Sequence, residues 1–169
     1  MSSMQIRLHG VAPESIVDGP GVRYAIFTQG CPHNCVGCHN PSSHNILGGY
    51  VKDVEVLFQD IKVNPILSGV TFSGGEPFLQ AKPLCKLGRL LKNENIPILT
   101  FSGYTLENLQ NLAQTSSAIT ELLDLTDMLI DGPYIQKLYS DDLLFRGSSN
   151  QRIWSKKNNS WFLDKEFIK

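Results

Sequence analysis

The order of hydrophobic and polar residues predicts short strands that alternate with amphipathic helices. Runs rich in apolar and β-branched residues predict strands within 5–8, 22–29, 69–77, 96–104 and 128–131. Apolar residues with helical spacing predict helices within 51–62, 83–95 and 105–114. The middle of the chain therefore repeats strand–helix units of roughly thirty residues, a pattern typical of a parallel sheet.

These units predict an α/β fold, an incomplete TIM-like βα barrel, in a single domain over residues 1–169. The pattern alone also allows a flat, doubly wound sheet. In either fold the loops that follow the parallel strands meet at one ligand-binding edge. The sequences QGC, SGGEP, FSGY and DGPY each follow a predicted strand, so we expect them to converge there. We expect the polar segment 146–169 to be irregular apart from a short strand near 152–156.

Length, charge and composition narrow the class of protein. A chain of 169 residues can bury a core without disulfides, and a net charge of −1 with scattered Lys and Arg argues against nucleic-acid binding. The sequence has no leader pattern and no run of eighteen apolar residues, so we expect no membrane association and a cytoplasmic location. Thiols stay reduced in the cytosol, so clustered cysteines there indicate metal or redox chemistry.

Three of the four cysteines lie in one short segment, residues 30–41, with the sequence GCPHNCVGCHNP. We call this segment the cysteine loop. Its Cys31, Cys35 and Cys38 form a C-x3-C-x2-C pattern, whose thiolates can bind a [4Fe-4S] cluster from three sides. Three ligands leave one iron with open coordination. An open iron suits chemistry at the cluster better than simple electron storage.

Other interpretations of these cysteines stay open at this point. A zinc ion could bind the three thiolates together with His33, His39, His44 or Cys85, although structural zinc sites usually use paired C-x2-C or Cys2His2 sets. Residues 35–39 also match the C-x-x-C-H of covalent haem attachment, which belongs to exported proteins. The Pro, His, Asn and Gly residues around these three cysteines argue against the interpretation that the cysteines only pack in a hydrophobic core. Only Cys85, in an apolar helical stretch, is expected to be a core thiol.

Further motifs make the sequence similar to the radical S-adenosylmethionine (SAM) superfamily. The resemblance rests on the cysteine loop followed by GGEP at 74–77. DGPG at 18–21, DGPY at 131–134 and RGSSNQRI at 146–153 narrow it further. With these, the chain resembles the activating proteins of the anaerobic (class III) ribonucleotide reductases over nearly its whole length.

The resemblance implies two cofactors, a [4Fe-4S] cluster held by the three cysteines and SAM bound to its open iron. One electron from the cluster would cleave SAM to methionine and a 5′-deoxyadenosyl radical, with no side-chain acid–base catalysis. This radical would remove a hydrogen atom from a glycine near the C-terminus of the reductase large subunit. The family also implies a flavodoxin-type electron donor.

The same resemblance maps SAM binding onto Gly74, Gly75 and Glu76. Glycines let the backbone approach a ligand, and the carboxylate or nearby carbonyls accept from the methionine amine. Further candidate contacts are Asn40, Ser73, Ser102 and Asp131. Each of these four residues also fits an ordinary turn. His33 is a candidate for a ring that faces the cofactor.

The remaining predictions concern charged residues and competing functions. Arg146 and Arg152 are candidates for docking a partner or its substrate loop, and Asp18 and Arg23 are expected to contact each other. Competing functions are activation of a different glycyl radical enzyme and a radical SAM reaction on a small metabolite. A zinc-binding module and a simple iron–sulfur electron carrier are the alternatives from other classes.

Overall fold

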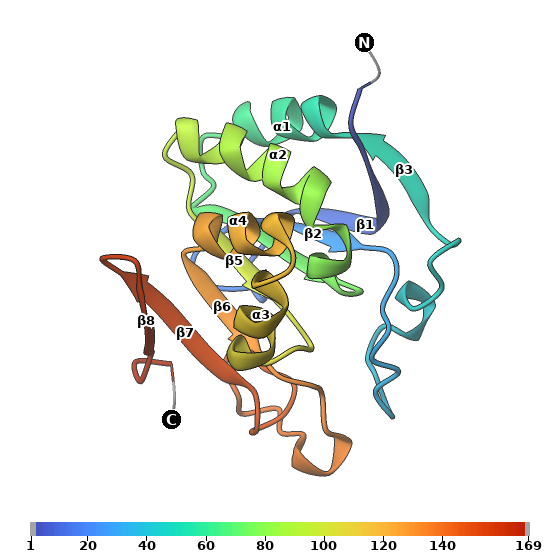
Figure 1. Cartoon of the computed structure of the whole chain (residues 1–169), viewed down its shortest axis with the longest axis vertical. Helices are drawn as coiled ribbons and strands as arrows, with labels where there is room; N and C mark the ends of the chain where they lie inside the picture. Colours follow the sequence, from blue (N-terminus) through green and yellow to red (C-terminus); the bar gives the residue numbers. More distant parts are fainter. Residues whose placement is uncertain (1–2, 168–169) are drawn as a thin grey trace.

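The computed structural model describes residues 3–167, which form one mixed sheet with four helices packed on one side (Figure 1). The strands are β1 (Gln5–Ser15), β2 (Arg23–Thr28), β3 (Tyr50–Asp53), β4 (Gly69–Gly74), β5 (Ile98–Phe101), β6 (Met128–Asp131), β7 (Arg152–Lys157) and β8 (Ser160–Leu163). The helices are α1 (Val54–Lys62), α2 (Ala81–Asn93), α3 (Leu106–Ala113) and α4 (Ser117–Leu125). Short 3₁₀ turns are η1 (Pro41–Ser43), η2 (Pro77–Gln80) and η3 (Gln136–Leu138).

Four parallel strands form the centre of this sheet. The order is β3-β1-β2-β4-β5-β6-β7-β8, with β2, β4, β5 and β6 parallel and the flanking strands antiparallel. The register runs from Arg23 opposite Gly69 to Thr28 opposite Gly74, so β2 and β4 end at the same edge. The predicted α/β fold with a parallel sheet is confirmed. Because the order is linear, the sheet keeps two free edges, as an incomplete barrel does.

The main hydrophobic core lies between the sheet and the helices. Phe72 of β4 and Ile26 of β2 pack in one buried cluster with Leu57, Leu84 and Leu91 of the helices. The helices keep this apolar side inward because their apolar residues recur every three or four positions. Thr105 caps α3, since its side chain accepts from the backbone N–H of Asn108.

The opposite face of the sheet carries a smaller apolar cluster. Leu99, Ile130 and Ile153 are buried there, and the rings of Phe145 and Phe167 pack against them. The two rings meet edge to face with centroids 5.6 Å apart. Residues from the C-terminal part of the chain thus fill the inner side of the open barrel.

The loop between β1 and β2 also fills this inner side. The backbone of Gly19 has φ of 135°, and a Cβ there would lie 2.7 Å from Cδ of Arg23 and 2.8 Å from Cδ1 of Leu99. Only glycine tolerates both the backbone angle and the close contact. The glycines of the DGPG motif are therefore explained by packing.

Two sequence-based predictions differ from the structure. Residues 51–53, predicted as helix, pair with β1 as part of β3, and the Asp53 side chain then caps α1. The segment 146–169, expected to be irregular apart from one strand, contains the β7–β8 hairpin. Asn158 and Asn159 make its turn with φ of 50° and 62°, which suits a two-residue hairpin loop.

A search of residues 3–167 finds no helix with the length and apolar character needed to cross a membrane.

Replacing Phe72 by Ala tests whether the helix-side core holds the sheet. Phe72 is fully buried, so we expect the free energy of unfolding to fall by about 3–5 kcal/mol. Val56→Ala on the exposed side of α1 is the control and should change it by less than about 0.5 kcal/mol. Urea unfolding of the cluster-free protein measures both values. Equal effects of the two variants would contradict this account of the core.

Candidate functional site

Loops from distant parts of the chain form one pocket at the carboxyl edge of the parallel strands. Its walls come from the cysteine loop after β2, from 73–75 at the end of β4, from 101–103 after β5 and from 132–134 after β6. The pocket has a volume of about 150 Å³ and is called the cysteine pocket below. The expected convergence of the loops that follow these strands is confirmed.

The cysteine loop turns sharply between its thiols. Asn34 and Gly37 have φ of 50° and 74°, and each directly precedes a cysteine. The backbone angle of Gly37 favours glycine, and a Cβ there would also displace the side chain of Gln136, which lies 2.7 Å away. These two left-handed residues bring Cys31, Cys35 and Cys38 to the same pocket. All three thiols are free and half-buried.

The chemistry of these thiols fits a positively charged iron–sulfur group. Burial raises the pKa of Cys31, and the nearby charges of Glu76, Cys35 and Cys38 raise it further. A bound cation offsets both effects because it stabilises the thiolate. Within residues 3–167, no three His, Cys, Asp or Glu side chains converge tightly enough to hold one metal ion. A four-iron cluster instead takes each cysteine at a separate iron.

The two glycines of the GGEP motif pack against the end of β2 and the start of the cysteine loop. Gly74 has φ of 94°, and a Cβ there would lie 2.3 Å from the backbone nitrogen of Thr28. A Cβ on Gly75 would lie 2.3 Å from the carbonyl oxygen of Gly30. That carbonyl also accepts from the N–H of Glu76 at 2.8 Å. Both glycines line the cysteine pocket, so a side chain at either position would disturb the pocket and the loop together.

Glu76 lies behind this pocket and joins the loops that build it. Its carboxylate is fully buried and accepts from four donors. The donors are Nε2 of His33 at 2.6 Å, Oγ of Ser102 at 2.9 Å, N of Gly103 at 2.9 Å and N of Phe78 at 3.1 Å. These donors come from the cysteine loop, the end of β5 and η2. The structure thus gives Glu76 an internal role, and its direct contact with a cofactor stays a prediction.

His33 forms part of the pocket wall. Its ring lies edge to face with Tyr104, with centroids 4.5 Å apart. It also lies so close to Gly103 that a Cβ there would be 2.4 Å from the ring. The sequence identified His33 as a candidate facing the cofactor, but the pairing with Glu76 was missed. A histidine between two cysteines carries no sequence signal for a carboxylate 43 residues away.

The other candidate SAM contacts occupy different surroundings. Ser73 and Ser102 line the cysteine pocket. Asn40 lines an adjoining hollow of about 300 Å³, the middle hollow, which shares Cys38 and Ser73 with that pocket. Asp131 is fully buried and stands apart from the lining of both spaces. Their contacts with SAM stay predictions.

Asp131 instead ties α3 to β7. Its carboxylate accepts from the N–H of Leu106 at 2.6 Å and from Nη2 of Arg152 at 2.6 Å. Arg152 also pairs with Glu107, and this hydrogen bond lowers the pKa of Glu107 to about 2. Arg152 therefore has two carboxylate partners within the chain. These internal pairs give Arg152 a structural role, and its part in docking a partner stays a prediction.

The DGPY and RGSSNQR motifs, separate in the sequence, form one unit beside the pocket. Asn150 donates to the carbonyl of Pro133 at 2.7 Å, and Gln151 donates to that of Gly132 at 3.2 Å. Ser148 accepts from the N–H of Ile135 at 3.1 Å. Gln151 itself lines the cysteine pocket. No single motif indicated this pairing, because it depends on β6 and β7 being neighbours in the sheet.

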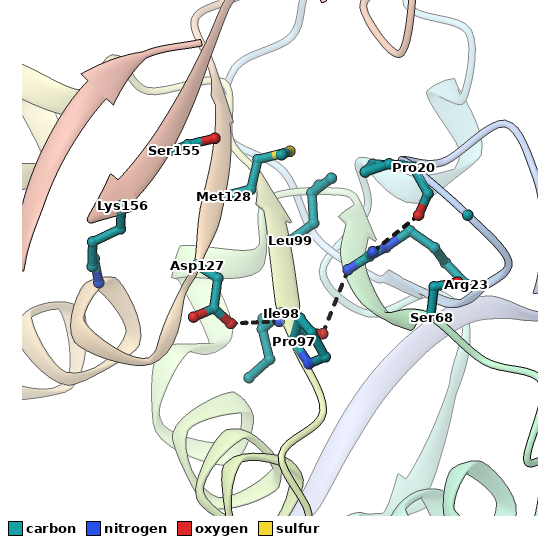
Figure 2. A pocket seen from close by; sticks show the side chains of 11 residues that line it. Pro20, Arg23, Ser68, Pro97, Ile98, Leu99, Asp127, Met128, Ser155 and Lys156 are labelled. Atoms are coloured by element: carbon teal, nitrogen blue, oxygen red, sulfur yellow. Dashed lines mark hydrogen bonds between the residues drawn. The ribbon is translucent and has the colours of Figure 1, made fainter. Parts of the chain in front are cut away.

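A separate cavity of about 520 Å³ lies near the opposite ends of the parallel strands (Figure 2). Arg23 lines it and donates to the carbonyls of Pro20 and Pro97. Burial lowers the pKa of Arg23 to about 10. Asp18 instead accepts from Ser15 at 2.5 Å, so the expected direct contact between Asp18 and Arg23 is wrong. This cavity contains none of the predicted site residues.

Cys85 is buried in α2, as expected for a core thiol. Burial raises its pKa to about 12, which keeps the thiol protonated. Its Sγ donates to the carbonyl of Ala118 at 3.3 Å. Cys85 is therefore a buried core thiol, whereas the three cysteines of the pocket are half-buried and line a cavity.

Comparison with known proteins gives the class and then the family. A family model described as a 4Fe-4S single cluster domain matches residues 17–154, so the chain is a protein of this iron–sulfur class. The anaerobic ribonucleoside-triphosphate reductase-activating protein of Escherichia coli (strain K12) is 34% identical over 153 residues, which are 86% of this chain and 96% of that protein. The chain belongs to the family of these activating proteins, as its motifs predicted.

Two further similarities are more partial. The pyruvate formate-lyase-activating enzyme of Clostridium pasteurianum is 34% identical over 132 residues, 75% of this chain and 55% of that enzyme. The crystal structure of QueE from Escherichia coli is 20% identical and covers 60% of this chain and 53% of that one, with a TM-score of 0.46. The match to QueE is too low to bear on function.

The cysteine assignment is tested by replacing one thiol inside the pocket and one outside. We expect the wild type to take up about four irons per chain on anaerobic reconstitution with iron and sulfide. Cys35→Ala should lose most of this iron and the visible absorbance of the cluster. Cys85→Ala is the matched control and should keep both. The number of irons per chain is measured on correctly folded protein. About four irons per chain in Cys35→Ala would contradict the assignment.

The role of Glu76 is tested by Glu76→Gln. An amide keeps the size of the side chain but replaces one acceptor oxygen with a donor, so at least one of the four donors loses its partner. We expect the free energy of unfolding to fall by about 1–3 kcal/mol in the cluster-free protein. Glu94→Gln, which removes an exposed ion pair with Lys62, should cost less than about 1 kcal/mol. Similar losses in the two variants would show that the buried carboxylate has no special role.

Proposed function

We propose that this protein is an activating enzyme that generates the glycyl radical on the large subunit of an anaerobic ribonucleoside-triphosphate reductase. The main observation behind this proposal is that the cysteine loop and the glycine turn at 74–75 line a single pocket. Membership of the activating-protein family supports the same reaction, since the match spans 96% of the Escherichia coli relative. The cofactors of the proposal are a [4Fe-4S] cluster and SAM.

In this proposal Cys31, Cys35 and Cys38 bind three irons of the cluster. These three ligands would leave one iron open, where SAM would bind. When bound, the reduced cluster supplies one electron to the sulfonium of SAM, which yields methionine and a carbon radical that takes a hydrogen atom from the substrate. The glycine turn at 74–75 leaves the pocket wall free of side chains where the methionine part of SAM would lie.

The residues around the pocket position these groups and keep water out. His33 and Ser102 line the wall, and both are fixed by hydrogen bonds to the buried carboxylate of Glu76. No carboxylate belongs to the lining of the pocket within residues 3–167. In this proposal the residues of the pocket act by positioning the cofactors and the substrate.

A protein segment is a suitable substrate for this site. The cysteine pocket, with about 150 Å³, opens into the middle hollow of about 300 Å³. Phe27, Phe101 and Tyr134 line the middle hollow beside Asp18 and Gln151. Aromatic walls with a few polar groups are common where a peptide enters a protein surface. The glycine to be activated would reach the pocket through this hollow.

The second candidate function is activation of a different glycyl radical enzyme, which the Clostridium pasteurianum relative motivates. That relative is matched over only 55% of its length, whereas the reductase-activating relative is matched over 96%. The agreement in length favours the reductase as partner. The remaining parts of the proposal are a cytosolic location, which agrees with the clustered cysteines, and a flavodoxin-type electron donor, which the resemblance to the family implies.

The partner is tested by mixing the anaerobically reconstituted, reduced protein and SAM with candidate substrates. With the purified large subunit of the reductase from the same organism, we expect the doublet of a glycyl radical in the electron paramagnetic resonance spectrum. We also expect about one molecule of 5′-deoxyadenosine per radical formed. Pyruvate formate-lyase in the same assay should give no doublet. A doublet on pyruvate formate-lyase alone would reverse the choice between the two candidates.

A further inference from the structure

We propose that Arg146 anchors the substrate protein by donating a hydrogen bond to an acceptor oxygen of the segment that enters the site. The proposal rests on the function proposed above and adds the residue that holds the partner. It concerns a groove that begins at the cysteine pocket and ends at Arg146.

The groove consists of three adjoining spaces that share lining residues. The cysteine pocket shares Cys38 and Tyr134 with the middle hollow. The middle hollow shares His39 and Gly147 with a third space of about 310 Å³, which we call the outer hollow. Arg146 lines the outer hollow. An extended chain that placed one residue at the pocket would therefore run past Arg146 with its neighbouring residues.

Arg146 has unused hydrogen-bonding capacity in a buried position. Its exposed fraction is only 8%, and its Nη1 donates to the carbonyl of Gln151 at 3.0 Å. Its Nε is buried and has no hydrogen-bond partner within residues 3–167. Burial lowers the pKa of Arg146, and no carboxylate opposes that shift. Because Nε is shielded from solvent, the donor open to an acceptor from outside the chain is Nη2, which makes no hydrogen bond within residues 3–167.

Two other arginines of this sheet, Arg23 and Arg152, have several hydrogen-bond acceptors within the chain. Arg23 donates to Thr71 and to the carbonyls of Val70 and Pro20. Arg152 is paired with the carboxylates of Asp131 and Glu107, as described above. Arg146 has neither arrangement. It is therefore the arginine of the RGSSNQR motif that is suited to an external partner.

The chain around Arg146 holds it in place. Phe145 has φ of 61°, an unusual angle for a residue with a large side chain, and its ring packs into the cluster of Leu99, Ile130 and Ile153. On the other side, Oε1 of Gln151 accepts from the N–H groups of Gly147 and Ser148 at 2.8 and 3.1 Å. A donor that is already fixed loses little entropy when it binds.

The rim of the outer hollow suits a peptide. Val17 is 71% exposed and Tyr139 is 45% exposed, and both line the hollow together with Leu143. His39, Ser140 and Asp141 line the same hollow, so both apolar and polar side chains surround Arg146. A mixed surface with an Arg anchor is typical of protein–protein contacts, where Arg is a frequent source of binding energy. The acceptor oxygen is a main-chain carbonyl or a carboxylate, since a guanidinium binds both.

The test compares Arg146→Met and Arg146→Lys with the matched control Arg89→Met. Arg89 lies on α2 and pairs with Glu121 on the exposed surface of the helices. Each reconstituted protein is titrated with the purified large subunit of the reductase, and the dissociation constant is measured in anaerobic buffer. The rate of radical formation is followed against the concentration of large subunit.

We expect Arg146→Met to weaken binding about tenfold or more, the loss that one hydrogen bond to a charged group predicts. The variant should need a higher concentration of large subunit for half-maximal activation. Excess large subunit should then restore most of the rate. Arg146→Lys should recover part of the affinity, and Arg89→Met should match the wild type. A steeper salt dependence of binding in the wild type than in Arg146→Met would point to a carboxylate as the acceptor, and an equal one to a carbonyl.

Wild-type affinity in folded Arg146→Met and Arg146→Lys would overturn this proposal while leaving the proposed function intact. A loss of maximal rate that excess large subunit does not restore would also overturn it, because Arg146 would then act on the reaction itself. Failure of the wild type to bind or activate the large subunit would overturn the proposed function, and the role of Arg146 with it.

Discussion

The buried carboxylate of Glu76 is the interaction on which the site depends. It accepts hydrogen bonds from the cysteine loop, from the loop after β5 and from η2, which are separate segments of the chain. A buried charge is stable only when donors surround it, so these segments must come together for the carboxylate to be buried at all. The geometry of the cysteine pocket is thereby coupled to the fold of the parallel strands. The adjacent glycines reinforce this coupling, because they allow backbone to pack directly on backbone.

The sheet supplies the second constraint. Parallel strands end at one edge, and their loops must share that edge whatever their sequences. The open strand order leaves the inner face of the barrel accessible, and Phe145, Phe167 and the loop that contains Gly19 fill part of it. Beside them, the cysteine pocket and the two hollows adjoin one another as far as Arg146. Under the proposed function, these spaces would receive the segment of the large subunit.

Much of this arrangement is predictable from local sequence. Periodicity identified the parallel strands and most helices, and the spacing of the cysteines with the later GGEP identified the pocket residues. The failures have physical causes. Residues 51–53 have a helical pattern but gain strand hydrogen bonds from β1, which local sequence does not reveal. Likewise, Asp131 and Arg152 find each other only because β6 and β7 are neighbours. The Asn158–Asn159 pair is a local signal for the hairpin turn, because asparagine tolerates the positive φ that both residues adopt.

The most direct test of the central claim is the electron paramagnetic resonance spectrum of the reduced protein, recorded with and without SAM. If Cys31, Cys35 and Cys38 hold a cluster whose fourth iron faces the glycine turn, SAM will change the spectrum of the reduced [4Fe-4S] cluster. The same change should be absent from a Gly75→Val variant, whose side chain would displace the backbone of the cysteine loop. A cluster whose spectrum is indifferent to SAM, or a protein that binds zinc in its place, would contradict the account.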